Sequence, residues 1–368
     1  MLALLLAGGL SMVFTLLFTP LLARAFKKLK LGQFVRADTP TTHVLKRGTP
    51  SMGGVIFVAA AVFGYFTAHL LGGGRPSASA VLVIFMMCGL GFIGFIDDFL
   101  KVSKQNSLGL HGWYKILGAV LVAIAFALVG INYRDSHGRS PVSTALSFIR
   151  DLPFDFIATF GVVFGTIAIV IWIVFITVST SNAVNLVDGL DGLAAGASIF
   201  AIGSYVIIGF WQFQQSCFNL AIAPENQFKC YDVSQPFELA TIAAAIVGAL
   251  IGFLWWNTSP AQIMMGDTGS FALGGALAAL AILSRTEMLL VLIGGLFVVI
   301  TLQVIIQRIY FKATKGKRIW KASPLHHHFE MKGWLEITIV VRFWIVSGLF
   351  VAVGVGLFYL EWLSSVAP

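Results

Sequence analysis

Apolar residues fill ten long stretches of the chain, and short polar segments separate these stretches. Each stretch has about 20 residues, the length that crosses a bilayer as an α-helix. The pattern predicts an all-α integral membrane protein of about ten transmembrane helices, organised as a single polytopic membrane domain over residues 1–368. The two stretches on either side of residues 285–287 could also form one long kinked helix. The predicted helices lie at about residues 2–23, 52–72, 78–96, 113–131, 157–178, 192–211, 238–256, 270–284, 287–307 and 339–360.

The composition of the chain agrees with this prediction. Hydrophobic residues make up 58% of the 368 residues and charged residues 11%, whereas soluble domains carry about 25% charged residues. This balance excludes an ordinary soluble protein.

The net charge of +8 is distributed unevenly between the two predicted faces of the membrane. With ten spans, alternate loops share a side, and most lysines and arginines fall on one side. The positive-inside rule makes that side cytoplasmic, so both termini are expected to be extracytoplasmic. The charge is then an orientation signal, helped by anionic membrane lipid, and gives no reason to expect a nucleic-acid partner. The basic side carries Arg24, Lys27, Lys28, Lys30, Arg36, Lys46, Arg47, Lys101, Lys104, Lys115, Arg308, Lys312, Lys315, Lys317, Arg318, Lys321, Lys332 and Arg342.

Two amides and two carboxylates lie within ten residues, directly between two apolar stretches: Asn182, Asn185, Asp188 and Asp191. Such groups cost free energy beside hydrocarbon unless water, a cation or a ligand satisfies them. Helix capping explains one Asp or Asn at such a position, but not four. This segment, on the predicted cytoplasmic side, is therefore the first candidate for a functional site.

Three further carboxylates lie at span ends on the same predicted side. Asp97 and Asp98 are adjacent near the end of the third span, and Asp267 precedes the eighth. Adjacent carboxylates repel each other, which favours a bound cation or a raised pKa for one of them. A solvated helix end for the pair, and a capping role for Asp267, are the alternatives.

Clustered carboxylates on a basic face indicate a hard divalent cation such as Mg²⁺, which binds through one or two carboxylates plus substrate phosphates. Phosphoryl transfer depends mostly on positioning and charge neutralisation, which a metal, lysines and helix N-termini supply. A site partly in lipid also suggests that one substrate is lipid-linked. The basic residues expected to complete a diphosphate clamp are Lys46, Arg47, Lys101, Lys104 and Lys115.

Three consecutive histidines, His326, His327 and His328, lie in the last predicted cytoplasmic loop. Neighbouring residues on a helix point about 100° apart, so these three cannot all reach one metal ion. We expect hydrogen bonding or phosphate contact by one or two of them instead.

The two long outer loops contain features that the sequence leaves open. Cys217 and Cys230 lie in one loop and could form a disulfide or stay as two thiols, whereas Cys88 lies inside the third span. The acids of these loops are scattered and are expected to be solvated surface residues: Asp135, Asp151, Asp155, Glu225 and Asp232.

Taken in order, the motifs of the chain resemble those of the phospho-N-acetylmuramoyl-pentapeptide transferase family. This family is part of the polyprenyl-phosphate N-acetylhexosamine-1-phosphate transferase superfamily, and the triple histidine separates it from the related branches. The resemblance runs from about residue 46 to residue 344. The motifs that carry it are residues 97–99, 182–192, 257–262, 266–270 and 324–330.

The resemblance implies an Mg²⁺-dependent enzyme of peptidoglycan synthesis in the bacterial cytoplasmic membrane. Such an enzyme transfers phospho-MurNAc-pentapeptide from UDP-MurNAc-pentapeptide to undecaprenyl phosphate, giving lipid I and UMP. The resemblance also implies a ten-span homodimer with its active site on the cytoplasmic face.

The same resemblance implies roles for the acids. Asp267 matches the Mg²⁺ ligand, and Asp97 matches a base acting on the lipid phosphate, with Asp98 beside it. Asp188 and Asn185 match residues at the diphosphate or the metal. The four acids Asp97, Asp98, Asp188 and Asp267 are therefore the catalytic candidates.

A uridine pocket and histidine contacts to the substrate are implied as well. Some family members have Phe where this chain has Met264, which removes aromatic stacking on the base, although Met can pack on a ring. The implied uridine-pocket residues are Gly189, Leu190, Asp191 and Asn257, and the implied histidine contacts are His326 and His327. The complete set of substrate-binding candidates is Lys46, Ser51, Lys101, Lys104, Lys115, Asn182, Asn185, Gly189, Leu190, Asp191, Asn257, Met264, His326, His327 and His328.

Two other functions stay open at this point. A related transferase would use another donor, such as UDP-N-acetylglucosamine, and would not need a peptide on it. An ion-coupled transporter would also concentrate acids in a membrane protein, but near the bilayer midplane on broken helices, whereas here they lie at span ends. A purely structural membrane protein would leave the inner carboxylates unexplained.

Overall fold

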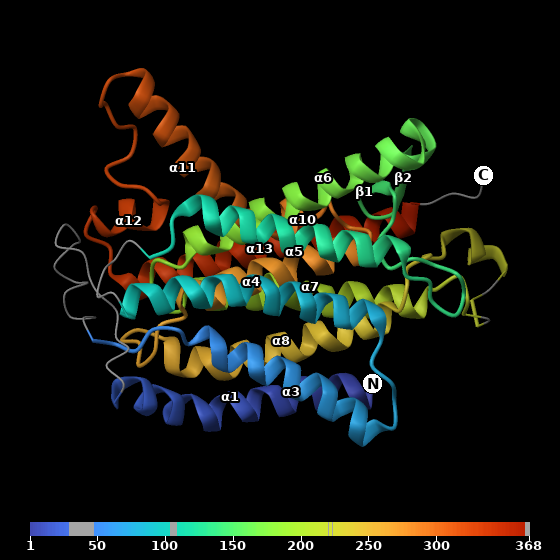
Figure 1. The fold of residues 1–368 in the computed structure, drawn as a ribbon, viewed down its shortest axis with the longest axis horizontal. Helices are drawn as coiled ribbons and strands as arrows, with labels where there is room; N and C mark the ends of the chain where they lie inside the picture. Colours follow the sequence, from blue (N-terminus) through green and yellow to red (C-terminus); the bar gives the residue numbers. More distant parts are fainter. Residues whose placement is uncertain (29–47, 104–108, 220, 223, 365–368) are drawn as a thin grey trace.

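The computed structural model describes residues 1–28, 48–103, 109–219, 221–222 and 224–364, and its secondary structure is almost entirely helical (Figure 1). Ten helices in the described residues are long and apolar enough to cross a membrane. The all-α membrane fold with about ten spans is therefore confirmed. The elements are α1 (Leu2–Lys28), α3 (Gly54–Gly72), α4 (Ala78–Ser103), α5 (Gly112–Asn132), β1 (Ala145–Ser147), β2 (Asp151–Asp155), α6 (Phe156–Val187), α7 (Leu193–Gln214), η1 (Pro224–Lys229), α8 (Pro236–Asn257), α9 (Gly266–Leu283), α10 (Leu290–Ile293), α11 (Gly295–Ala313), α12 (Leu325–Glu330) and α13 (Glu336–Ser364).

Several helices extend beyond their predicted ends, and two of the extensions, in α4 and α6, carry candidate site residues. The third span was expected to end near residue 96, but α4 continues to Ser103. The fifth was expected to end near residue 178, but α6 continues to Val187 and includes Asn182 and Asn185. Polarity alone does not end a helix, and neither extension contains Gly or Pro, the residues that most often do. The predicted ends were wrong because they followed apolarity instead of helix breakers.

The ninth predicted span is interrupted. The structure has a short helix α10, then Gly294, then α11, which begins at Gly295. Two successive glycines weaken a helix and allow its axis to change direction, and α11 leaves the bundle at an angle (Figure 1). The alternative of one long kinked helix through residues 285–287 is wrong, since residues 284–289 separate α9 from α10.

The outer loops have more structure than the sequence analysis predicted. Strands β1 and β2 form a small antiparallel hairpin. Asp135, expected on the solvated surface, is 9% exposed, and that expectation was wrong. Its carboxylate accepts hydrogen bonds from the backbone N–H groups of His137 and Arg139 and from the Ser234 hydroxyl. These donors replace the water that the carboxylate loses.

Cys217 and Cys230 form a disulfide, which decides between the two alternatives that the sequence left open. Arg150 fastens this loop to the rest of the outer surface. Its guanidinium donates to the backbone carbonyl of Cys230, pairs with Glu361 of α13 at 3.0 Å and lies 4.0 Å from the centre of the Tyr231 ring.

Helix α9 is the most enclosed span, and it packs against α3, α4, α6, α7 and α8. All side chains from residue 268 to residue 283 are buried. Most of them are small, which allows neighbouring backbones to approach closely, as is typical of helix contacts in membranes. A Cβ added at Gly274, for example, would lie 2.4 Å from the Cα of Ser181 in α6. The first residues of α9 are therefore held firmly relative to α4 and α6.

The two ends of the bundle differ. Helix α12 lies at one end, whereas β1, β2, the start of α1 and the end of α13 lie toward the other (Figure 1). We call them the α12 end and the hairpin end. This arrangement agrees with an even number of spans.

A buried carboxyl lies at the hairpin end. Glu287, in the loop between α9 and α10, is 4% exposed. Its Oε2 accepts hydrogen bonds from Trp172 Nε1 at 3.1 Å and from the backbone nitrogen of Ser147 at 3.3 Å. Burial raises the pKa of Glu287 from 4.5 to about 7, because an ionised carboxylate loses hydration there.

This shift predicts a pH-dependent effect of Glu287→Gln on stability. Above pH 4.5 the unfolded chain ionises Glu287 while the folded chain resists ionisation, so folding is increasingly disfavoured until the pH passes about 7. The neutral amide removes this penalty and keeps an oxygen acceptor. We expect the Tm of the variant to exceed that of the wild type only slightly at pH 5 and clearly at pH 8. At pH 8 the gain in unfolding free energy should be on the order of 3 kcal/mol.

Thermal unfolding of detergent-purified protein at the two pH values measures this difference. Asp232→Asn is the control, since that side chain is 67% exposed. An advantage of Glu287→Gln that is equal at pH 5 and pH 8 would contradict the explanation.

Candidate active site

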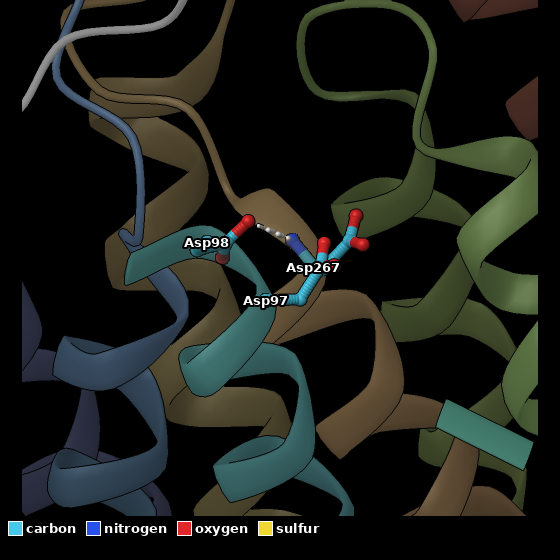
Figure 2. Close-up of side chains that lie close together, drawn as sticks. All are labelled: Asp97, Asp98 and Asp267. Atoms are coloured by element: carbon cyan, nitrogen blue, oxygen red, sulfur yellow. Dashed lines mark hydrogen bonds between the residues drawn. The ribbon is translucent and has the colours of Figure 1, made fainter. Parts of the chain in front are cut away.

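Helices α4 and α9 touch backbone to backbone where the acids lie. A Cβ added at Gly94 would lie 2.2 Å from the carbonyl oxygen of Asp267. Gly94 lies one turn before Asp97 and Asp98, so its missing side chain brings both acids to the first turn of α9. Figure 2 shows Asp97 and Asp98 from α4 beside Asp267 from α9.

Asp98 caps the N-terminus of α9. Its Oδ1 accepts from the backbone nitrogen of Asp267 at 3.1 Å, as drawn in Figure 2, and its Oδ2 accepts from the backbone nitrogen and the hydroxyl of Thr268 at 2.9 and 2.7 Å. A carboxylate satisfies orphan N–H groups at a helix N-terminus and is stabilised by the helix dipole. Gly266 enters the helix with φ +75°, and a Cβ there would lie 2.5 Å from Asp98 Oδ2. Glycine at residue 266 therefore makes room for this cap.

Asp97 and Asp267 share two lysines. Lys101 Nζ lies 2.6 Å from Asp97 Oδ2 and 3.1 Å from Asp267 Oδ2. Lys115 Nζ, from α5, lies 2.9 and 2.6 Å from the same two oxygens. Two carboxylates and two ammonium groups thus form a closed charge quartet. Removing either sign would leave like charges together in a poorly hydrated place, which costs several kcal/mol.

Asp97, Asp98 and Asp267 are the group of metal-ligating side chains identified among the described residues, with ligand atoms within 4.8 Å of one another. Carboxylate oxygens suit Mg²⁺. Three carboxylates are a donor set that fits a hard cation, and the ammonium groups of Lys101 and Lys115 balance two of them at Oδ2 of Asp97 and Asp267. None of the three histidines belongs to this group.

Of the two predicted amides, one reaches the acids. Asn185 Nδ2 donates to Asp267 Oδ1 at 3.0 Å and to the Ser270 hydroxyl at 2.9 Å. Asn182 Nδ2 instead donates to the Val178 carbonyl of its own helix at 2.8 Å. Asn185 therefore orients Asp267 from α6.

Asp188 follows α6 directly and is half-buried. Desolvation raises its pKa well above the ordinary value, and the negative charges of Asp267, Asp98 and Asp191 raise it further. Asp188 thus lies within electrostatic reach of the quartet, as its predicted role requires.

The turn at residues 188–192 is bonded to the loop between α8 and α9. Asp191 Oδ2 accepts from the backbone nitrogen of Ala261 at 3.0 Å, and Asn257 Oδ1 accepts from the backbone nitrogen of Gly192 at 3.1 Å. Asp191, Asn257 and Leu190 are each 3% exposed. These three predicted pocket residues are therefore buried, whereas Gly189 is half-buried.

The three histidines of α12 have three different surroundings. His326 is buried against the turn, where a Cβ added at Gly189 would lie 2.2 Å from His326 Nε2. His327 pairs with Glu330 at 2.5 Å. His328 Nδ1 accepts from the backbone nitrogen of Lys321 at 3.1 Å, and desolvation together with Lys332 and Lys321 lowers its pKa. The prediction that they would not share one metal agrees with this arrangement.

The remaining predicted site residues are placed in part. Met264 and Ser51 are half-buried, and the backbone of Met264 pairs with Pro50 and Gly53 of the segment that enters α3. Lys46 and Lys104 lie outside the described residues. Sequence reasoning missed Thr268 and Ser270, although both stand in the same short motif as Asp267.

Two family models match parts of the chain. Residues 80–285 match the family model described as glycosyl transferase family 4. Residues 46–58 match phospho-N-acetylmuramoyl-pentapeptide-transferase signature 1. The first match includes the quartet, and the second includes Lys46 and Ser51.

Full-length relatives decide the family. A phospho-N-acetylmuramoyl-pentapeptide-transferase from Clavibacter michiganensis subsp. michiganensis is 62% identical, covering 99% of this chain and 100% of the relative. The chain belongs to the phospho-N-acetylmuramoyl-pentapeptide-transferase family. Relatives with the same name from Kineococcus radiotolerans and Pseudarthrobacter chlorophenolicus are 54% and 52% identical, covering 98% and 99% of both chains. The chain is therefore a transferase with a multi-pass membrane fold.

The contact at Gly94 predicts the effect of a single methyl group on this transferase. Gly94→Ala places a Cβ against the backbone of α9 and must move Asp97 away from Asp267. A displacement of about 1 Å at a catalytic site costs on the order of 100-fold in rate. We expect transferase activity to fall by about this factor while the protein still purifies folded.

Gly356→Ala is the matched control, because a Cβ at Gly356 in α13 meets nothing within 4 Å. Equal activity of the two alanine variants would show that the close contact of α4 with α9 does not matter.

Proposed function

We propose that this chain transfers phospho-MurNAc-pentapeptide from UDP-MurNAc-pentapeptide to undecaprenyl phosphate, giving lipid I and UMP in peptidoglycan synthesis. The observation that carries this proposal is the quartet of Asp97, Asp267, Lys101 and Lys115, which meets at the ends of the three spans α4, α5 and α9. It is supported by full-length relatives that bear the name of this transferase.

The reaction needs charge neutralisation more than covalent chemistry. An oxygen of the lipid phosphate forms a bond to the sugar-bearing phosphorus of the donor. The bond from that phosphorus to the oxygen bridging to UMP breaks, and UMP leaves with that oxygen. Lys101 and Lys115 are the cations that would hold the donor diphosphate, since both ammonium groups lie at the acids.

A bound Mg²⁺ would neutralise charge on the phosphates. Asp267 is its proposed ligand, with the facing oxygen of Asp97 as a second. Asn185 holds Asp267 Oδ1 and so fixes the direction of its other oxygen. We assign Asp97 also to the acceptor phosphate, as a base for its last proton, and Asp98 to positioning, because both its oxygens accept from the first turn of α9.

The turn at residues 188–192 supports a place for the nucleotide beside the quartet. Asp188 and Gly189 are half-buried, whereas Asp191 and Asn257 fix the shape of the turn through hydrogen bonds with backbone N–H groups. His326 packs on Gly189 and would contact the donor from α12. We place uridine here and the diphosphate toward Lys101.

Two features support a cytoplasmic location for the site. Among the described residues, most lysines and arginines lie at the span ends or in the loops on the α12 side, among them Lys312, Lys317 and Lys321, as the positive-inside rule requires. The disulfide Cys217–Cys230 lies in the loop between α7 and α8 at the hairpin end, and disulfides persist in oxidising compartments outside the cytoplasm. On this orientation both termini are extracytoplasmic, in a bacterial cytoplasmic membrane. A homodimer is part of the proposal through the family resemblance alone.

Asp267→Asn tests the metal-bound site. The amide keeps the shape of the side chain but loses the charge that a cation needs, so UMP release should fall by at least about 100-fold. Purified protein with UDP-MurNAc-pentapeptide, undecaprenyl phosphate and Mg²⁺ is the assay. EDTA should abolish wild-type turnover and added Mg²⁺ should restore it.

Asp232→Asn, at an exposed outer acid, is the control. Turnover by Asp267→Asn near the wild-type rate, or full wild-type activity in EDTA, would contradict the proposal.

Lys115→Met tests whether lysine and cation compete for the same oxygens. Met can keep the packing of the side-chain stem near Phe271 but has no charge. Without the ammonium, Asp97 and Asp267 should bind Mg²⁺ at a lower half-saturating concentration. The KM for the donor should rise about tenfold, since one phosphate contact is lost.

Steady-state UMP release over a range of Mg²⁺ and donor concentrations separates the two effects. Lys27→Met, at an exposed lysine of α1, should change neither quantity. A higher half-saturating Mg²⁺ concentration in Lys115→Met than in the wild type would contradict the proposal that Lys115 and the cation compete for the same oxygens.

A further inference from the structure

The turn at residues 188–192 is held from a helix that none of the sequence motifs includes. Glu336, the first residue of α13, accepts a hydrogen bond through Oε1 from the backbone nitrogen of Asp191 at 2.9 Å. Two turns further along α13, Trp344 Nε1 donates to the carbonyl oxygen of Gly192 at 3.3 Å. The peptide groups of the turn therefore meet one acceptor and one donor from the same helix.

The backbone of this turn depends on glycine. Gly192 has φ +79°, in the left-handed region that favours glycine. A Cβ added at Gly196, in the first turn of α7, would lie 2.1 Å from Cε2 of Trp344. The indole of Trp344 thus lies directly on the start of α7, and α13 covers the turn from one side.

The opposite side of the turn is bonded to the loop that leads into α9. Ala261 donates to Asp191, and Gly192 donates to Asn257. Asn257 in turn donates to the carbonyl of Ile263 at 2.9 Å, shortly before Asp267. The turn is thus clamped between α13 and the segment that carries the acid of the quartet. A shift of the backbone of the turn would therefore displace the residues next to the quartet.

We infer that Glu336 is a positioning residue for the nucleotide donor. This inference rests on the proposed function for the placement of the nucleotide at the turn. The carboxylate of Glu336 accepts hydrogen bonds and donates none, and its Oε1 lies 2.9 Å from the backbone nitrogen of Asp191. A backbone N–H left without an acceptor in this buried segment would drive the turn to rearrange. Glu336 acts on the donor through the turn and leaves the acceptor lipid untouched.

The experiment compares Glu336→Ala with Glu336→Gln. Glutamine keeps an oxygen acceptor at the same reach, whereas alanine has none. Glu336→Ala should raise the KM for UDP-MurNAc-pentapeptide about tenfold, the size expected for a lost hydrogen bond to a charged group. Its kcat and its KM for undecaprenyl phosphate should stay within about twofold of the wild type, and Glu336→Gln should recover most of the donor KM.

Glu361→Ala is the matched control, since Glu361 lies on the same helix at the hairpin end and pairs with Arg150. It should leave the donor KM unchanged even where it lowers Tm. Trp344→Phe is a second variant, for use if Glu336→Ala does not purify folded. Phenylalanine keeps an aromatic ring against Gly196 but loses the hydrogen bond to the carbonyl of Gly192, so the KM for the donor should rise severalfold.

Calorimetric titration with UDP gives a readout that does not need turnover. Weaker UDP binding by Glu336→Ala than by the wild type and by Glu336→Gln supports the inference, whether or not the wild-type protein turns over. Absence of UMP release by the wild-type protein would contradict the proposed function and leave this binding result standing. A donor KM equal to that of the wild type in Glu336→Ala, an equal rise in both KM values, or a Gln variant as weak as the Ala variant would overturn the inference.

Discussion

The site depends on the contact of α4 with α9. Two helices that carry acids at adjacent positions would normally stay apart, because carboxylates in a poorly hydrated place repel each other. Gly94 has no side chain to keep the two helices apart. The carboxylate of Asp98 accepts hydrogen bonds from the N-terminus of α9, and Lys101 and Lys115 balance the charges of Asp97 and Asp267. The result is a quartet in which two carboxylates and two ammonium groups balance each other, so it contains no uncompensated charge.

The packing of the bundle serves the same end. Helix α9 is enclosed by other spans and lined by small side chains, so its N-terminus has little freedom to move. Asn185 from α6 and Lys115 from α5 then approach one carboxylate, Asp267, from two more directions. Each of these residues comes from a different span, and rigid helices place them more precisely than loops would. The more exposed α11 and the hairpin lie away from this centre.

Much of this arrangement could be predicted from the sequence, because membrane spans need long apolar stretches and the carboxylates interrupt them at recognisable places. The number of spans, the class of fold and the clustering of Asp97, Asp98 and Asp267 followed from that pattern and from the motifs. The break at Gly294 and the continuation of α6 to Val187 did not, since apolarity reports burial in lipid and says little about where a polar helix face ends. The different duties of Asp97 and Asp98 could not be predicted either, because adjacent residues on a helix face different neighbours and only packing decides which. Likewise, Glu336 gives no signal in sequence: it is one more acid at a helix start until its partner, the backbone of Asp191, is known.

We propose that Asp97 and Asp267 together form the cation site that holds the donor phosphates. The most direct measurement is a titration with Mn²⁺, a paramagnetic stand-in for Mg²⁺, followed by electron paramagnetic resonance in the presence and absence of UDP. We expect one Mn²⁺ per chain, bound more tightly with UDP present, and loss of that binding in the double variant Asp97→Asn with Asp267→Asn. Unchanged Mn²⁺ binding in the double variant would contradict the account.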